Sequence, residues 1–170
     1  MRQLGLAGIL AITVACGYHV SGHGDLLPKN IKTIAIPASA NVTTHYELSR
    51  RLPEDIAREF ISRTRYAVVS DPNQADAILN TAVVNYFAYP TTIDPVSGRA
   101  TAAVATVILQ LRLTDRATGK ILFNRPNADF RQEYEISENP QQYFDESATA
   151  MARLSRDVAQ NVVTAVLENF

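Results

Sequence analysis

The feature that most limits the fold is the alternation of apolar and polar side chains over residues 100–114. In an extended strand, one face would carry Ala103, Ala105, Val107, Leu109, Leu111 and Leu113. The opposite face would carry Thr106, Gln110, Arg112 and Thr114. A sheet with one apolar face must cover that face with other elements, so the rest of the chain has to supply them.

Other segments supply further strands and a hairpin. Apolar runs predict strands over residues 31–36, 66–69 and 77–89. A turn at residues 115–119 leads into a returning segment over residues 120–124, which is typical of a hairpin. Strand character resumes at Ala128, where Phe130, Gln132, Tyr134 and Ile136 alternate with charged residues.

A helix is predicted over residues 44–63. Leu48, Leu52, Ile56 and Phe60 recur every four residues and form one apolar stripe. Thr44 and Glu47 have the spacing of a capping box at the helix start. Pro53 lacks an amide hydrogen, so we expect either a kink or a later start of the helix.

A second, longer helix is predicted over residues 140–169. Asn139 precedes Pro140, a proline suited to the first helical position, and an apolar stripe runs from Phe144 to Val166. Two such helices can cover the apolar face of one sheet. The predicted fold is therefore α+β, a two-layer sandwich with both amphipathic helices on one face of a mostly antiparallel sheet of four to five strands.

The first residues form an apolar leader that ends at the single cysteine. Arg2 is the only charge before Asp25, and residues 4–15 read LGLAGILAITVA, which is short for a membrane-spanning helix and suits a signal peptide. Val14, Ala15 and Cys16 resemble the lipobox of bacterial lipoproteins, although Thr13 stands where leucine is usual. The alternative is an ordinary secretory signal that leaves a free cysteine.

The lipobox resemblance implies three segments. Residues 1–15 are a lipoprotein signal peptide, residues 16–30 are a lipid-anchored tether, and residues 31–170 are a single α+β domain. Cys16 would carry a diacylglycerol and an N-acyl chain, and no other cofactor is expected. Gly17 follows the cysteine where an inner-membrane retention signal would have aspartate, so the expected location is the periplasmic face of the outer membrane.

Composition excludes several other functions. Sixteen Lys and Arg face seventeen Asp and Glu, for a net charge of -1, which argues against a nucleic-acid partner. One cysteine excludes an internal disulfide framework and a cysteine-based zinc site. His19 and His23 have helical metal-ligand spacing, but Gly22 and Gly24 favour a flexible tether there. Neither a phosphate-binding loop nor a nucleophile elbow is present, so we expect neither a metal site nor catalytic residues.

Two arginines are the candidate binding residues. Arg99 leaves a loop over residues 90–99 that follows the aromatic residues Tyr86, Phe87 and Tyr89. Arg131 would lie toward the same end of the adjoining strand. Guanidinium groups suit phosphate and carboxylate ligands. The alternative is that both arginines are surface charges that balance Asp94, Glu133 and Glu135.

Several segments resemble the LPS-assembly lipoproteins, the LptE family. They are CGYHVSG from Cys16, LLPKNIKTIAIP from Leu26, YAVVSDPNQADAIL from Tyr66 and LRLTDRATGKILF from Leu111. Their order matches the family across nearly the whole mature chain. The resemblance implies two helices on a mostly antiparallel sheet, in agreement with the periodicity.

The resemblance also implies a function and partners. Family members are anchored in the outer membrane, plug the lumen of the LPS-assembly barrel LptD, assist its assembly, and are thought to bind lipopolysaccharide during export. By position, the lipopolysaccharide contacts would be Arg99 and Arg131. A second basic residue just upstream in the strand has no counterpart, because Asn127, Ala128 and Asp129 stand there.

A hypothesis of another class stays open. The chain could be a non-enzymatic, periplasm-facing scaffold lipoprotein of a different envelope or secretion complex, which would have a similar layout. Depletion separates the two hypotheses: loss of surface lipopolysaccharide supports the translocon role, whereas an intact surface favours the scaffold.

Overall fold

A computed structural model describes residues 27–136 and 140–168. The elements run in the order β1 (Thr33–Ala35), β2 (Ala40–Asn41), α1 (Tyr46–Arg63), β3 (Ala67–Val69), a 3-10 turn (Pro72–Gln74), β4 (Ala77–Ile93), β5 (Ala100–Asp115), β6 (Ile121–Glu135) and α2 (Pro140–Glu168). Cys16, His19, His23 and the predicted cap Asn139 lie outside the described residues, and so does the side chain of Phe144.

The sheet has six strands and is mixed. Its order is β3-β1-β4-β5-β6, with β2 also paired to β4. The three long strands are antiparallel as predicted, whereas β1 runs parallel to β3 and β4, and β2 runs parallel to β4. The prediction of four to five mostly antiparallel strands was therefore wrong in count and partly in direction. The reason is that α1 is a crossover connection, which returns the chain to the same end of the sheet, and that β2 is only two residues long.

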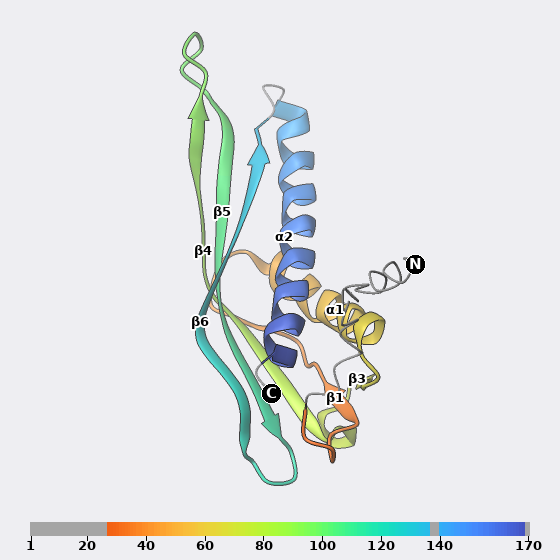
Figure 1. The fold of residues 1–170 in the computed structure, drawn as a ribbon. Coiled ribbons are helices and arrows are strands. Elements are labelled where there is room, and N and C mark those ends of the chain that lie inside the picture. The colour runs from red at the N-terminus through yellow and green to blue at the C-terminus, as the bar shows by residue number, and fades with distance from the viewer. Residues whose placement is uncertain (1–26, 137–139, 169–170) are drawn as a thin grey trace, which may run out of the picture.

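Both helices lie on the same side of the sheet, as Figure 1 shows, which confirms the predicted two-layer arrangement. The α1 stripe of Leu48, Leu52, Ile56 and Phe60 is fully buried. Opposite it, the odd-numbered residues of β5 from Ala103 to Leu113 are buried too, as the alternation predicted. From α2 the core receives Leu154, Val158, Val162 and Val166.

The start of α1 differs from the prediction. The helix begins at Tyr46 after His45, and no side chain caps it, so the capping box of Thr44 and Glu47 does not form. The turn before the helix is instead stabilised by Asn41, whose Oδ1 accepts hydrogen bonds from the Thr43 amide at 2.9 Å and the Thr43 hydroxyl at 2.8 Å. The helix then continues through Pro53 to Arg63, so the later start is excluded.

Bulges shift the register of β4 and β6, the two long strands on either side of β5. The register of β4 shifts between Val83 and Asn85, so the buried face changes from odd to even residues and Tyr86 turns toward the helices. A second shift lies in β6, where Ala128 pairs with Leu109 but Arg125 pairs with Leu111. The two segments predicted over residues 120–124 and from residue 128 are therefore one bulged strand.

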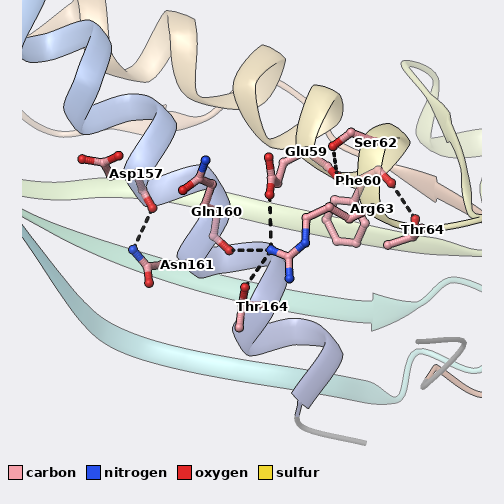
Figure 2. Close-up of polar contacts among 9 residues, drawn as sticks. All are labelled: Glu59, Phe60, Ser62, Arg63, Thr64, Asp157, Gln160, Asn161 and Thr164. Atoms are coloured by element: carbon pink, nitrogen blue, oxygen red, sulfur yellow. Dashed lines mark hydrogen bonds and ion pairs between the residues drawn. The ribbon is translucent and has the colours of Figure 1, made fainter. Parts of the chain in front are cut away.

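The two helices are joined at their C-terminal ends by one arginine (Figure 2). Arg63 of α1 donates hydrogen bonds from Nη1 to Glu59 Oε1 at 3.2 Å, to the Gln160 carbonyl at 3.4 Å and to Thr164 Oγ1 at 2.8 Å. Gln160 and Thr164 belong to α2. These contacts fix the last turns of both helices beside each other.

Candidate functional site

The hairpin of β4 and β5 carries the first candidate residue, Arg99, at its tip. This hairpin projects past the end of β6 (Figure 1). Asp94 Oδ1 accepts hydrogen bonds from the amides of Val96 at 2.9 Å and Ser97 at 2.6 Å, and Gly98 adopts a φ of 69° that favours glycine. Asp94 is thus occupied by its own turn, and it does not balance Arg99, which has no ion pair within the described chain.

The second candidate, Arg131, lies in the edge strand β6. Its Nη2 is 3.6 Å from Asp129 Oδ2, and both side chains are largely exposed, so the pair contributes little to stability. Across the sheet, Arg131 stands opposite Thr106, which in turn stands opposite Phe87. Thr106 itself is buried, and its hydroxyl has no hydrogen-bond partner in the part of the chain that the structure describes.

The structure does not bring the two arginines together. Arg131 pairs with Thr106, whereas Arg99 precedes the first residue of β5, so the two lie seven positions apart along that strand. At the rise of an extended strand this is a separation of ~23 Å. The strands do pair in sequence order, β4 with β5 and β5 with β6. However, β6 ends before the hairpin tip, so Arg131 does not lie beside Arg99 as expected.

The aromatic residues before the tip are divided between the two faces. Phe87 and Tyr89 lie on the face away from the helices, 43% and 44% exposed, with stacked rings whose centroids are 6.4 Å apart. Tyr86 points to the helix side, where its ring centroid is 4.0 Å from that of His45. With Ile93 and Val96, the outward-facing pair makes the upper half of the hairpin an exposed apolar surface, which we call the hairpin surface and define as Phe87, Tyr89, Ile93 and Val96.

A hollow beside Arg131 contains a basic residue that the sequence did not reveal. The hollow has a volume of about 410 Å³ and lies between β6 and the last turns of α2. Its lining includes Arg125 and Arg131 together with Asp129 and Glu168. Arg125 also lies 5.6 Å above the centroid of the Phe123 ring. A register shift in β6 lies between Arg125 and Arg131, so the spacing of the residues in the sequence does not by itself say which side chains line this hollow.

The open face carries a shallower polar recess nearer the other end of the sheet. Its volume is about 360 Å³, and Asn80, Arg112 and Asn124 stand side by side across three strands there. Gln110 adds a further amide, and Ala38, Ala40 and Ala82 leave space beside them. These are neutral donors and acceptors with one positive charge, an arrangement suited to polar contact with a partner.

The perturbed carboxyl groups serve turns and strand ends. The pKa of Asp76 is lowered chiefly by the Lys32 amide, and that of Asp94 chiefly by the Ser97 amide. In the same way the Asn73 amide lowers the pKa of Asp71, and the Thr118 amide lowers that of Asp115. All four groups are held in the charged form, and a general acid would need the opposite shift.

Two searches of the described residues are negative. They contain no group of three or more metal-ligating side chains. Among the helices of residues 27–136 and 140–168, none combines the length and the apolar character needed to cross a membrane.

Solved structures with the same fold include several lipoproteins. Uncharacterized lipoprotein B from Nitrosomonas europaea is 16% identical with a TM-score of 0.56, covering 89% of this chain and 96% of its own. The PelC dodecamer from Paraburkholderia phytofirmans is 13% identical with a TM-score of 0.55, covering 85% and 92%. The rare lipoprotein B from Shewanella oneidensis is 12% identical with a TM-score of 0.53, covering 79% and 94%. At these identities the likeness establishes the fold alone.

Sequence comparison is more specific. No curated protein matches the chain significantly. The profile of the family described as LptE, Lipopolysaccharide-assembly, matches residues 31–166, from before β1 to the last turn of α2. This span contains the whole sheet, α1 and all of α2 except its last two residues, so the match concerns nearly all of the folded domain. The chain therefore belongs to the LptE lipopolysaccharide-assembly family.

Proposed function

We propose that this chain is a non-enzymatic outer-membrane lipoprotein that plugs the lumen of the LptD barrel, assists the assembly of that barrel and contacts lipopolysaccharide during export. The observation that carries the proposal is the family match over residues 31–166. Membership in a lipopolysaccharide-assembly family favours this role over a scaffold in another envelope complex.

The membrane attachment rests on Cys16. In the proposed mature protein, this residue carries a diacylglycerol and an N-acyl chain, and the domain faces the periplasm. One acyl chain holds a protein only marginally, since each buried CH₂ contributes about 0.8 kcal/mol, whereas several chains together give a stable anchor.

Two features of the surface support a role as a plug. The open face of the sheet is free of helices, and the tip of the β4–β5 hairpin extends beyond the rest of the sheet (Figure 1). Val96 in the tip turn is 94% exposed, and Ile93 beside it is 60% exposed. In the proposed complex, the barrel wall covers the hairpin surface.

Lipopolysaccharide contact would use arginines. Arg125 and Arg131 share the hollow beside α2, and Arg99 lies at the hairpin tip. Guanidinium groups bind phosphate and carboxylate through paired hydrogen bonds, and those are the anionic groups that a charged glycolipid offers. The hollow also contains Asp129 and Glu168, so its net charge is balanced and a ligand would have to displace the Arg131–Asp129 pair.

Co-purification from membranes tests the proposal. The full chain is extracted from membranes with detergent and then purified by affinity. A large β-barrel protein is expected to co-purify with it. The matched control is the full chain with Cys16→Ser, which should recover much less of the barrel if anchoring precedes assembly. Recovery of a soluble or inner-membrane complex without any barrel would contradict the translocon role and favour the alternative scaffold. Depletion of the chain should likewise block surface lipopolysaccharide.

A further inference from the structure

A pocket with basic residues at its rim lies at the end of the sheet opposite to the hairpin tip. Its volume is about 360 Å³, and it is lined by Leu27, Lys29, Ile31, Lys32, Arg65 and Tyr66. The pocket precedes Thr33 and Ala67, which are paired at the start of the parallel strands β1 and β3. β4 also starts at this end and finishes at the tip (Figure 1).

The pocket combines an apolar floor with three cations. Leu27, Ile31 and Tyr66 are buried members of the core. Lys29, Lys32 and Arg65 are exposed around them, and no carboxylate is among the lining residues. Within the described chain none of the three cations has an ion pair. A site with apolar contacts and several unpaired cations suits an amphiphilic anion.

Hydrogen bonds hold the backbone at or beside each of the three basic residues. The Ile31 amide donates to the Pro28 carbonyl at 2.8 Å, which closes a turn with Lys29 inside it. The Lys32 amide donates to Asp76 Oδ2 at 2.9 Å. Arg65 lies between Thr64, whose hydroxyl donates to the Phe60 carbonyl at 2.7 Å, and the buried Tyr66. The three positions are therefore set before any ligand arrives.

The pocket also lies close to the proposed anchor along the chain. The Leu27 amide donates to the Tyr66 hydroxyl at 3.1 Å, so the described chain begins inside the pocket. Only eleven peptide steps separate Leu27 from Cys16, and even a fully extended chain of that length spans no more than ~40 Å. A lipid-anchored Cys16 would keep the pocket within reach of the membrane surface.

We infer that this basic pocket binds the phosphate headgroup of an anionic phospholipid in the membrane that carries the acylated Cys16. The inference rests on the proposed anchor. Bound in this way, the domain holds the starts of β1, β3 and β4 at the surface of its own membrane, at the end of the sheet opposite to the hairpin tip.

Hydrogen exchange in nanodiscs tests this inference on the full lipidated chain. The chain is placed in discs of phosphatidylcholine alone or of phosphatidylcholine mixed with phosphatidylglycerol. Peptides covering residues 27–33 and 64–67 should exchange roughly tenfold more slowly in the anionic discs, because three cations gain lipid contacts. The variant with Lys29→Glu, Lys32→Glu and Arg65→Glu should lose this difference.

Matched controls distinguish an effect of the pocket on hydrogen exchange from an effect of total charge. The variant with Arg50→Glu, Arg153→Glu and Arg156→Glu changes the net charge equally on exposed helix positions and should keep the protection. Unchanged exchange over residues 103–113 checks that each variant is folded. If three glutamates unfold the segment, Lys29→Gln, Lys32→Gln and Arg65→Gln remove the charges without reversing them.

Other outcomes would overturn the inference. Equal exchange in both kinds of disc, or protection that survives in the pocket variant, excludes a headgroup site. Protection reproduced by inorganic phosphate in neutral discs would assign the pocket to a soluble anion. Absence of acyl mass on Cys16, read from the intact protein, would overturn the anchor and with it this inference.

Discussion

Ser155 of α2 donates a 2.5 Å hydrogen bond to Asp55 Oδ2 of α1, across one hundred positions of sequence. Ser155 is fully buried and Asp55 is 8% exposed. The other carboxylate oxygen of Asp55 contacts Arg58. A carboxylate in an apolar interface must find donors, so this bond restricts how α1 and α2 can slide past each other.

Removal of this donor should destabilise the domain. Ser155→Ala leaves one oxygen of Asp55 without its buried partner, which we expect to lower the free energy of unfolding by about 1–3 kcal/mol. Urea denaturation measures the change. The matched control is Ser62→Ala, because the Ser62 hydroxyl donates to the Glu59 carbonyl in an exposed turn and should matter by less than about 0.5 kcal/mol. Equal effects would show that the interhelical bond is unimportant.

Two phenylalanines test which face of the sheet is the core. Phe60 lies on the core-facing side of α1 and is fully buried. Phe87 follows the bulge in β4 and is 43% exposed. Phe60→Ala should lower the free energy of unfolding by about 3–5 kcal/mol. Phe87→Ala should change it by about 0.5 kcal/mol or less. A large loss of stability in the Phe87 variant would mean that the open face is covered in the isolated domain.

Acid should weaken the link between β1 and the start of β4. Asp76 Oδ2 accepts hydrogen bonds from the Lys32 amide, the Thr33 amide and the Thr33 hydroxyl, and the Lys32 amide contributes most to its lowered pKa. The folded pKa lies below the unfolded value of about 3.9, so this stabilisation is present above that pH and is lost as the pH falls through the folded pKa.

The corresponding variant should alter the acid transition. Asp76→Ala is expected to lower the melting temperature at neutral pH by several degrees and to flatten the decline of stability below about pH 4. Thermal melts across pH measure both effects. Asp157→Ala removes an exposed carboxylate of α2 and serves as the control. A parallel decline in the Asp76 variant and the unmodified chain would exclude this carboxylate as the source.

The proposed barrel contact predicts a requirement for an apolar hairpin. Ile93→Glu with Val96→Glu places two charges where the barrel wall should lie, and we expect recovery of the barrel to fall about tenfold or more, since buried unpaired charges are costly. The control is Ile121→Glu, which alters an isoleucine that is 50% exposed, against 60% for Ile93, in the hairpin at the opposite end of the sheet. Similar recovery with both variants would move the contact away from the hairpin surface.

Lipopolysaccharide binding should depend on the arginines of the hollow. Arg125→Glu and Arg131→Glu should each weaken binding roughly tenfold, equivalent to about 1.4 kcal/mol, while the fold remains intact. Arg99→Glu tests the tip separately. Arg112→Glu, in the recess on the open face, is the control. A direct binding assay at moderate salt in which Arg125→Glu and Arg131→Glu behave like Arg112→Glu would exclude the hollow as the contact.

Periodicity predicted the long elements well because their side chains face one core. The stripe from Leu48 to Phe60 and the alternation from Ala103 to Leu113 both appear in the structure as predicted. The predicted start of the first helix was wrong: Thr43 donates hydrogen bonds to Asn41 in the preceding turn, and His45, not Thr44, stands at the N-cap position. Strand β2 was missed because two residues show no period, and its pairing with Ala82 and Val83 is decided by a distant segment.

The sequence by itself determined the α+β class, both amphipathic helices, the long hairpin and the family. These depend on local periodicity and on the order of segments, which a chain carries without folding. Only the tertiary structure decided the parallel strands, the separation of Arg99 from Arg131 and the presence of Arg125 and Arg131 in one hollow. The physical reason is that these features depend on strand pairing and register: a bulge of one residue exchanges the faces of a strand, and its position depends on neighbouring strands.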